Sequence, residues 1–163
     1  MKIKNRYAYL IRYFQETMPV AESELNYTTP FELLVAVILS AQCTDKRINQ
    51  ITPALFRDYP TPEAMSLATP DIIYEYIRSV SYPNNKARHL VGMAQMLVRD
   101  YDGEVPSTGE ELEKLPGVGR KTANLMLGDV FKVPGVVVAD THCIRITGLL
   151  GLTDGSKDPT KVE

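Results

Sequence analysis

The amine of Lys121 is the side chain in this sequence that most resembles a nucleophile. It follows a Leu-Pro-Gly-Val-Gly segment at 115–119 and lies in the first turn of the helix expected after it. The positive end of a helix dipole disfavours a cation at this position, which favours the neutral amine that a nucleophilic lysine needs. Arg120 is its neighbour, and two adjacent cations at this end of a helix suggest that an anion binds there. Solvated surface charge is the alternative for each residue taken alone.

The turn itself has the pattern helix, Pro-Gly-x-Gly, helix, which is typical of a helix-hairpin-helix. Glycines let the chain reverse tightly and let backbone N–H groups approach a phosphate without side chains in the way. The N-terminus of the next helix adds a favourable dipole. We therefore predict that the amides of Gly117, Val118 and Gly119 hold a DNA phosphate, a contact that positions DNA and reads no bases. The alternative is a plain helix–turn–helix corner in which the glycines serve packing.

Asp140 is the second candidate for chemistry. It follows the apolar stretch 134–139, the one strand-like segment, which should be a buried extended connector because it has no partner strand. Asp140 is predicted to cap a helix over 141–150. A capping carboxylate is held rigidly and stays ionised, so capping and catalysis are compatible. Lys121 and Asp140 together indicate a site that acts on DNA.

The elements that position these residues are predicted to be helices. Residues 4–18 carry one apolar stripe, and 31–41 are apolar on all sides, as expected for a buried central helix. Pro53 should kink or break the helix that follows. Residues 81–85 read as a turn before another striped helix. Five Thr-led helix starts complete an all-α pattern of short helices: Thr29, Thr44, Thr61, Thr69 and Thr108.

Composition limits the function classes. The chain has 163 residues, a net charge of −2 and a pI near 5.7, so any DNA affinity must come from local groups rather than a strongly basic surface. The two cysteines, Cys43 and Cys143, cannot build a zinc site or a four-thiolate cluster, so no metal site is predicted. No membrane span or signal peptide is evident. We expect a cytoplasmic, nucleoid-associated protein with no membrane partner.

The sequence resembles the endonuclease III family of helix-hairpin-helix DNA glycosylases. The resemblance implies a six-helix core domain at 25–133, with the helix-hairpin-helix at 109–131. Residues 1–24 would be an N-terminal helix of an incomplete second helical lobe, to which 134–163 also belong. Five segments carry the resemblance in the family's order: 25–34, Leu39–Asp45, Gly103–Pro106, Leu115–Asn124 and Val138–His142.

The resemblance implies base excision repair of double-stranded DNA that carries oxidised pyrimidines or abasic sites. Lys121 would displace the damaged base and form a Schiff base, and β-elimination would then cut the strand. Asp140 would stabilise positive charge on the sugar. Gln42 would enter the gap left by the flipped nucleotide, and Asp45 would lie near the DNA. Tyr82 replaces the family's usual leucine wedge and could either stack on bases or pack the turn.

Two other functions remain as alternatives. The adenine glycosylase branch shares the scaffold but lacks the nucleophilic lysine, and a non-catalytic helix-hairpin-helix module needs only the turn. The family also carries a 4Fe-4S cluster, and none of its four cysteines is present in this sequence. We therefore expect the chain to be a shortened form that binds no cluster, with the cluster cysteines beyond Glu163. A monomer is expected for the full-length protein, and a dimer is an alternative for the shortened chain.

Overall fold

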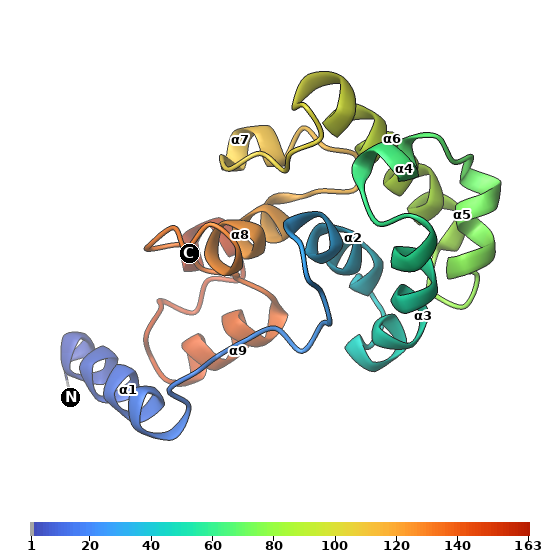
Figure 1. The fold of residues 1–163 in the computed structure, drawn as a ribbon. Coiled ribbons are helices and arrows are strands. Elements are labelled where there is room, and N and C mark those ends of the chain that lie inside the picture. The colour runs from blue at the N-terminus through green and yellow to red at the C-terminus, as the bar shows by residue number, and fades with distance from the viewer. Residues whose placement is uncertain (1) are drawn as a thin grey trace. The chain divides into compact units, whose positions relative to one another are not determined.

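The computed structural model describes residues 2–163, and all regular elements in that range are helices (Figure 1). The all-α prediction is confirmed. None of these helices is long and apolar enough to cross a membrane. The helices are α1 (Ile3–Thr17), α2 (Pro30–Ser40), α3 (Asp45–Asp58), α4 (Pro62–Ser66), α5 (Pro70–Ile77), α6 (Pro83–Asp100), α7 (Gly109–Leu112), α8 (Arg120–Asp129), α9 (Thr141–Leu149) and α10 (Pro159–Val162).

The described chain forms two compact units. The central unit is Glu24–Pro134 and contains α2 to α8. The terminal unit combines the segment that ends at Ser23 with Gly135–Glu163, and it contains α1, α9 and α10. Each unit is described by itself below.

Helix α2 is the centre of the central unit's core, as predicted. Eight of the nine residues from Phe31 to Leu39 are buried, and the ninth, Glu32, is half-buried. The helix begins where the Thr29 side chain accepts the Glu32 N–H at 3.1 Å, with Pro30 in the first helical position. It contacts α3, α6 and α8, and it lies between α3 and α8 in Figure 1. An apolar helix has no polar face to expose, so its neighbours must cover it on several sides.

The same threonine cap starts five helices of this unit, and it explains the brief connections between them. In each case the threonine oxygen accepts the backbone N–H three residues later. The predicted short helices after Thr61 and Thr69 are confirmed as α4 and α5, and both pack against α6. Local hydrogen bonds therefore set where these helices begin, and packing on α6 holds them in place.

Two local predictions for this unit are corrected by the structure. Of the predicted kink or break at Pro53, the break is wrong: α3 is continuous, because Ile48, Thr52 and Leu55 bury one face of it on both sides of the proline. That burial outweighs the roughly 3 kcal/mol that an interior proline costs a helix. Residues 83–85 are also not part of a turn. Pro83 occupies the first helical position of α6, and the turn ends at Tyr82.

The terminal unit is held together by polar contacts from α1. The Arg6 guanidinium donates to the carbonyls of Leu150 and Gly151, both at 3.2 Å, and the Tyr7 hydroxyl donates to Leu152 O at 2.9 Å. A guanidinium suits this position because the C-terminus of α9 carries partial negative charge. Helices α1 and α9 bury no residues.

The connector before α9 is only partly buried. Ala139 is 7% exposed, whereas Val137 is 39% exposed. The prediction of a buried connector is therefore wrong for Val137. Successive side chains of an extended segment point to opposite sides, so a segment without partner strands can bury one side and expose the other.

Candidate functional site

The predicted helix-hairpin-helix turn joins α7 to α8. Leu115 and Val118 are buried under the turn, and the Val118 N–H donates to Leu115 O at 3.1 Å. Gly117 has φ +80°, and a Cβ at this position would lie 3.0 Å from Cβ of His89 on α6. Glycine is therefore required here both by the backbone angle and by the close approach of α6. The Val118 amide is already paired inside the turn, which leaves the neighbouring amides for a ligand.

The N-terminus of α8 has no side-chain cap. Its N-cap residue is Gly119, no acidic residue lies in the first turn, and Arg120 and Lys121 begin the helix. The first N–H groups of any helix lack partners within the helix. A Cβ added at Gly119 would meet no heavy atom within 4 Å, so the space beside its α-carbon is open. An uncapped, cationic helix start next to open space suits an anion such as a phosphate.

The two glycines of the turn should respond differently to alanine. Gly117→Ala should destabilise the fold by about 1–3 kcal/mol, since it forces a Cβ into a positive φ and against His89. Gly119→Ala should change stability by less than about 0.5 kcal/mol, because its φ of −102° suits any residue. Its new methyl group would stand where a phosphate approaches, so DNA affinity should fall about tenfold.

Urea melts and fluorescence anisotropy with duplex DNA measure these two effects. Equal losses of stability in both variants would contradict the assignment of Gly119 to the open face. Unchanged DNA affinity in Gly119→Ala would contradict its place under the phosphate.

Lys121 is exposed at the second position of α8. Within residues 2–163, no side-chain hydrogen bond or ion pair engages its amine. Arg120 is exposed beside it. The amine is therefore accessible to a ligand bound at the turn.

The predicted gap-filling residues, Gln42 and Tyr82, come from loops that the structure brings together. Gln42 follows α2 and Tyr82 precedes α6, and the Ser81 hydroxyl lies 2.9 Å from the Gln42 carbonyl. Both residues have positive φ, at 56° and 53°. Tyr82 is 63% exposed, so its ring does not pack the turn. Asp45 is half-buried in the first turn of α3.

The sequence reasoning missed the polar cluster beneath these loops. Lys86 is 6% exposed, and burial lowers the pKa of its amine. Burial opposes ionisation of the nearby Cys43 thiol. However, hydrogen bonds from Ser81 and the charges of Lys86 and Arg47 lower its pKa overall. The missed signal was the spacing of Lys86, which lies on the apolar stripe of α6: Lys86, Leu90, Met93 and Leu97 are all buried.

Asp140 belongs to the terminal unit, whereas Lys121 belongs to the central unit. The prediction that it caps a helix is confirmed: Asp140 Oδ1 accepts the Cys143 N–H at 2.7 Å at the start of α9. The carboxylate is half-buried. The pKa of Cys143 is raised by burial and by the charge of Asp140. The cap fixes the carboxylate against α9 and leaves Oδ2 for other contacts.

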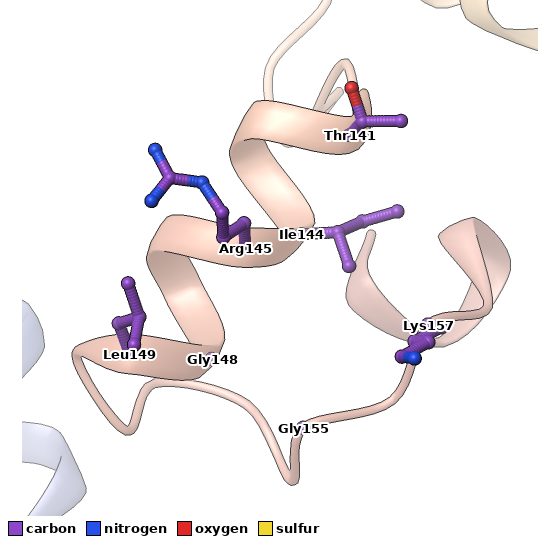
Figure 2. A pocket seen from close by; sticks show the side chains of 7 residues that line it. All are labelled: Thr141, Ile144, Arg145, Gly148, Leu149, Gly155 and Lys157. Carbon is purple, nitrogen blue, oxygen red and sulfur yellow. The ribbon is translucent and has the colours of Figure 1, made fainter.

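A hollow of about 500 Å³ lies beside α9 in the terminal unit (Figure 2). Ile144 and Leu149 give it apolar walls, and Arg145 and Lys157 add cationic groups. It is bounded by α9 and by the segment that carries Gly155 and Lys157 in Figure 2. Asp140 does not line it, so the hollow is separate from the candidate carboxylate.

Comparison with known proteins identifies the fold. Residues 35–163 match the model of the HhH-GPD superfamily base excision DNA repair proteins. Endonuclease III of Synechocystis sp. is 44% identical over 160 residues, which are 98% of this chain and 73% of that protein. Endonuclease III of Bacillus subtilis is 43% identical over 91% of this chain and 67% of its own length. The chain belongs to the endonuclease III family.

Solved structures agree with this family assignment. A trapped endonuclease III–DNA covalent intermediate superposes with a TM-score of 0.91 at 40% identity, covering 100% of this chain and 76% of that one. A non-covalent endonuclease III–DNA complex gives a TM-score of 0.92 at the same identity and coverage. A thermostable thymine-DNA glycosylase, at 23% identity and a TM-score of 0.77, shares the fold. This endonuclease III homologue is thus a DNA-binding DNA glycosylase and abasic-site lyase of base excision repair.

The endonuclease III family usually carries a 4Fe-4S cluster. Cys43 and Cys143 are the two cysteines of this chain, and they lie in different units. Within residues 2–163, no three or more His, Cys, Asp or Glu side chains are grouped to hold a metal ion. These residues therefore do not fit a four-thiolate cluster, and no step of the reaction is derived through one.

Proposed function

We propose that this protein removes oxidised pyrimidines from double-stranded DNA and cleaves the resulting abasic site through Lys121. The observation that carries the proposal is the accessible Lys121 amine next to an uncapped helix N-terminus in a helix-hairpin-helix turn. The amides of Gly117 and Gly119, with those of the first turn of α8, hold a phosphate. Arg120 adds positive charge. The DNA backbone at this turn then brings a flipped nucleotide to Lys121.

The chemistry begins when the neutral Lys121 Nζ attacks C1′ of the flipped nucleotide. A C1′–N bond to lysine forms as the glycosidic bond breaks, and the base leaves with the electron pair and takes up a proton. Asp140 stabilises the positive charge that develops on the sugar and assists proton movement. Opening of the sugar ring gives a Schiff base between C1′ and Lys121.

The Schiff base then makes the C2′ proton acidic. Loss of that proton and breakage of the C3′–O bond cut the strand on the 3′ side of the lesion. Water hydrolyses the remaining Schiff base and frees the lysine. Only lysine, carboxylate and water are required for these steps.

Three further residues serve DNA binding in this proposal. Gln42 and Tyr82 enter the gap left by the flipped nucleotide. The exposure of Tyr82 favours stacking of its ring on the neighbouring bases. Asp45, in the first turn of α3, lies near the DNA in this proposal.

Borohydride trapping tests the proposal. The protein is incubated with a duplex that carries one abasic site or one thymine glycol, and sodium borohydride is added to reduce any Schiff base to a stable amine. We expect a covalent protein–DNA adduct with both duplexes and strand cleavage without borohydride. A duplex with an adenine mispair serves as the control. Excision of that adenine without an adduct would support the adenine glycosylase alternative, and binding without any reaction would support the non-catalytic module.

A further inference from the structure

Lys86 is a buried cation on α6 whose role the proposed chemistry does not use. It is 6% exposed, and no carboxylate in residues 2–163 lies within salt-bridge distance of its amine. Its Nζ donates to Leu39 O at 2.8 Å and Ala41 O at 2.7 Å, and it lies 3.4 Å from Ser81 Oγ. An ammonium has three N–H donors, so these three acceptors satisfy it completely.

The acceptors lie at the last turn of α2 and on the two loops that carry the gap-filling residues. Leu39 and Ala41 are at the C-terminus of α2, where unpaired carbonyls and the helix dipole favour a cation. Gln42 follows immediately. On the other loop, the side-chain amine reaches the Ser81 hydroxyl, and the Lys86 backbone N–H makes the first helical hydrogen bond of α6, to Tyr82 O at 3.1 Å. One residue therefore contacts both loops.

Ser81 makes a second bridge between the same loops. Its hydroxyl lies 2.9 Å from Gln42 O and 3.2 Å from Ala41 O, and its backbone N–H donates to Cys43 Sγ at 3.2 Å. The hydroxyl also receives the third N–H of Lys86. The loop after α2 and the turn before α6 are thus joined by a single hydrogen-bonded cluster.

Both loops also contain strained backbone that requires support. Gln42 and Tyr82 are exposed non-glycine residues at φ 56° and 53°. Such conformations persist only where the surrounding contacts hold them, and they concentrate at functional sites. Neither side chain is anchored in the core, so the support must come from the backbone contacts of the loops. Lys86 and Ser81 supply those contacts.

We propose that Lys86 and Ser81 are positioning residues that lock the loop after α2 to the turn before α6, so that Gln42 and Tyr82 reach the DNA gap together. Neither Lys86 nor Ser81 touches the substrate. The inference rests on the proposed function, because it assigns the gap to Gln42 and Tyr82. It predicts a defect in handling the duplex rather than in the chemistry of Lys121.

Lys86→Met and Ser81→Ala test this role. Methionine keeps the length and apolar stem of lysine but removes the donors. Single-turnover excision of thymine glycol from a duplex should fall about 10- to 100-fold, since small misplacements of positioning groups have effects of this size. Borohydride trapping on a single-stranded abasic oligonucleotide, which has no gap to fill, should change less than about threefold. In a Gln42→Ala background, Lys86→Met should lower the rate of duplex excision by less than about a further threefold, because the two changes disrupt the same step.

Leu97→Ala is the matched control for lost stability, because Leu97 is fully buried on the same helix and contacts neither loop residue by hydrogen bonds. All variants are assayed well below their melting temperatures. If Lys86→Met does not fold, the half-buried Ser81→Ala carries the test. Equal losses on duplex and single-stranded DNA, or full duplex activity in both variants, would overturn the inference. An inactive parent protein would instead overturn the proposed function, and the inference with it.

Discussion

Lys121→Ala should form no borohydride-trapped adduct, and its excision of thymine glycol should fall at least about 1,000-fold, since removal of a covalent nucleophile has effects of this order or larger. The stability of the fold should not fall. Lys121 is exposed at the positive end of α8, so removing its charge should leave stability unchanged or raise it by up to about 1 kcal/mol. Gel analysis of trapped complexes and urea melts measure the two effects.

Lys4→Ala is the matched control for this prediction. Lys4 is exposed at the second position of α1, a helix that also lacks a side-chain cap and has no acidic residue in its first turn. Its substitution should give the same small gain in stability and a normal yield of adduct. An adduct in Lys121→Ala as abundant as in the parent would show that another amine is the nucleophile. Loss of the adduct in Lys4→Ala would show that the effect is not specific.

Asp140→Asn should lower base excision about 100- to 10,000-fold while leaving the fold nearly intact, because general acid–base groups contribute on this scale. Asparagine caps helices as well as aspartate, so the contact to the Cys143 N–H should survive. Loss of the charge should lower the free energy of unfolding by only about 0.3–1 kcal/mol. Asp140→Ala removes both the charge and the helix cap, so its free energy of unfolding should be about 1 kcal/mol lower than that of Asp140→Asn. Single-turnover excision and thermal melts separate the two variants.

Asp140→Asn should lose less activity on a preformed abasic site than on a damaged base. An abasic aldehyde has no base to displace, so the sugar does not pass through the charge that Asp140 stabilises. Asp158→Asn is the control, since Asp158 caps α10 through an equivalent contact to Thr160 N–H at 3.1 Å. Asp158→Asn should have a slightly lower melting temperature and a normal rate of base excision. Normal excision by Asp140→Asn would assign Asp140 to capping alone.

Local chemistry allowed much of this protein to be predicted from its sequence. Thr29 and Asp140 cap helices because a side-chain oxygen needs only the N–H two or three residues later. The turn at Gly117 could be predicted for the same reason, since a positive φ is a property of one residue and its neighbours. Helix starts, the hairpin and the exposed Lys121 therefore follow from short stretches of sequence.

Tertiary structure decided what depends on distant segments. Pro53 remains inside a continuous helix because buried neighbours hold both sides of it. Lys86 is buried because carbonyls 47 and 45 residues away accept its N–H groups. The loops of Gln42 and Tyr82 meet through a hydrogen bond that spans 39 residues. Spacing along the chain carries the period of a helix but not the identity of the segment that packs against it. The hairpin turn and the exposed Lys121 at the start of α8 were therefore determined by the sequence itself, whereas the support beneath the loops of Gln42 and Tyr82 was decided by the packing of α2 against α6.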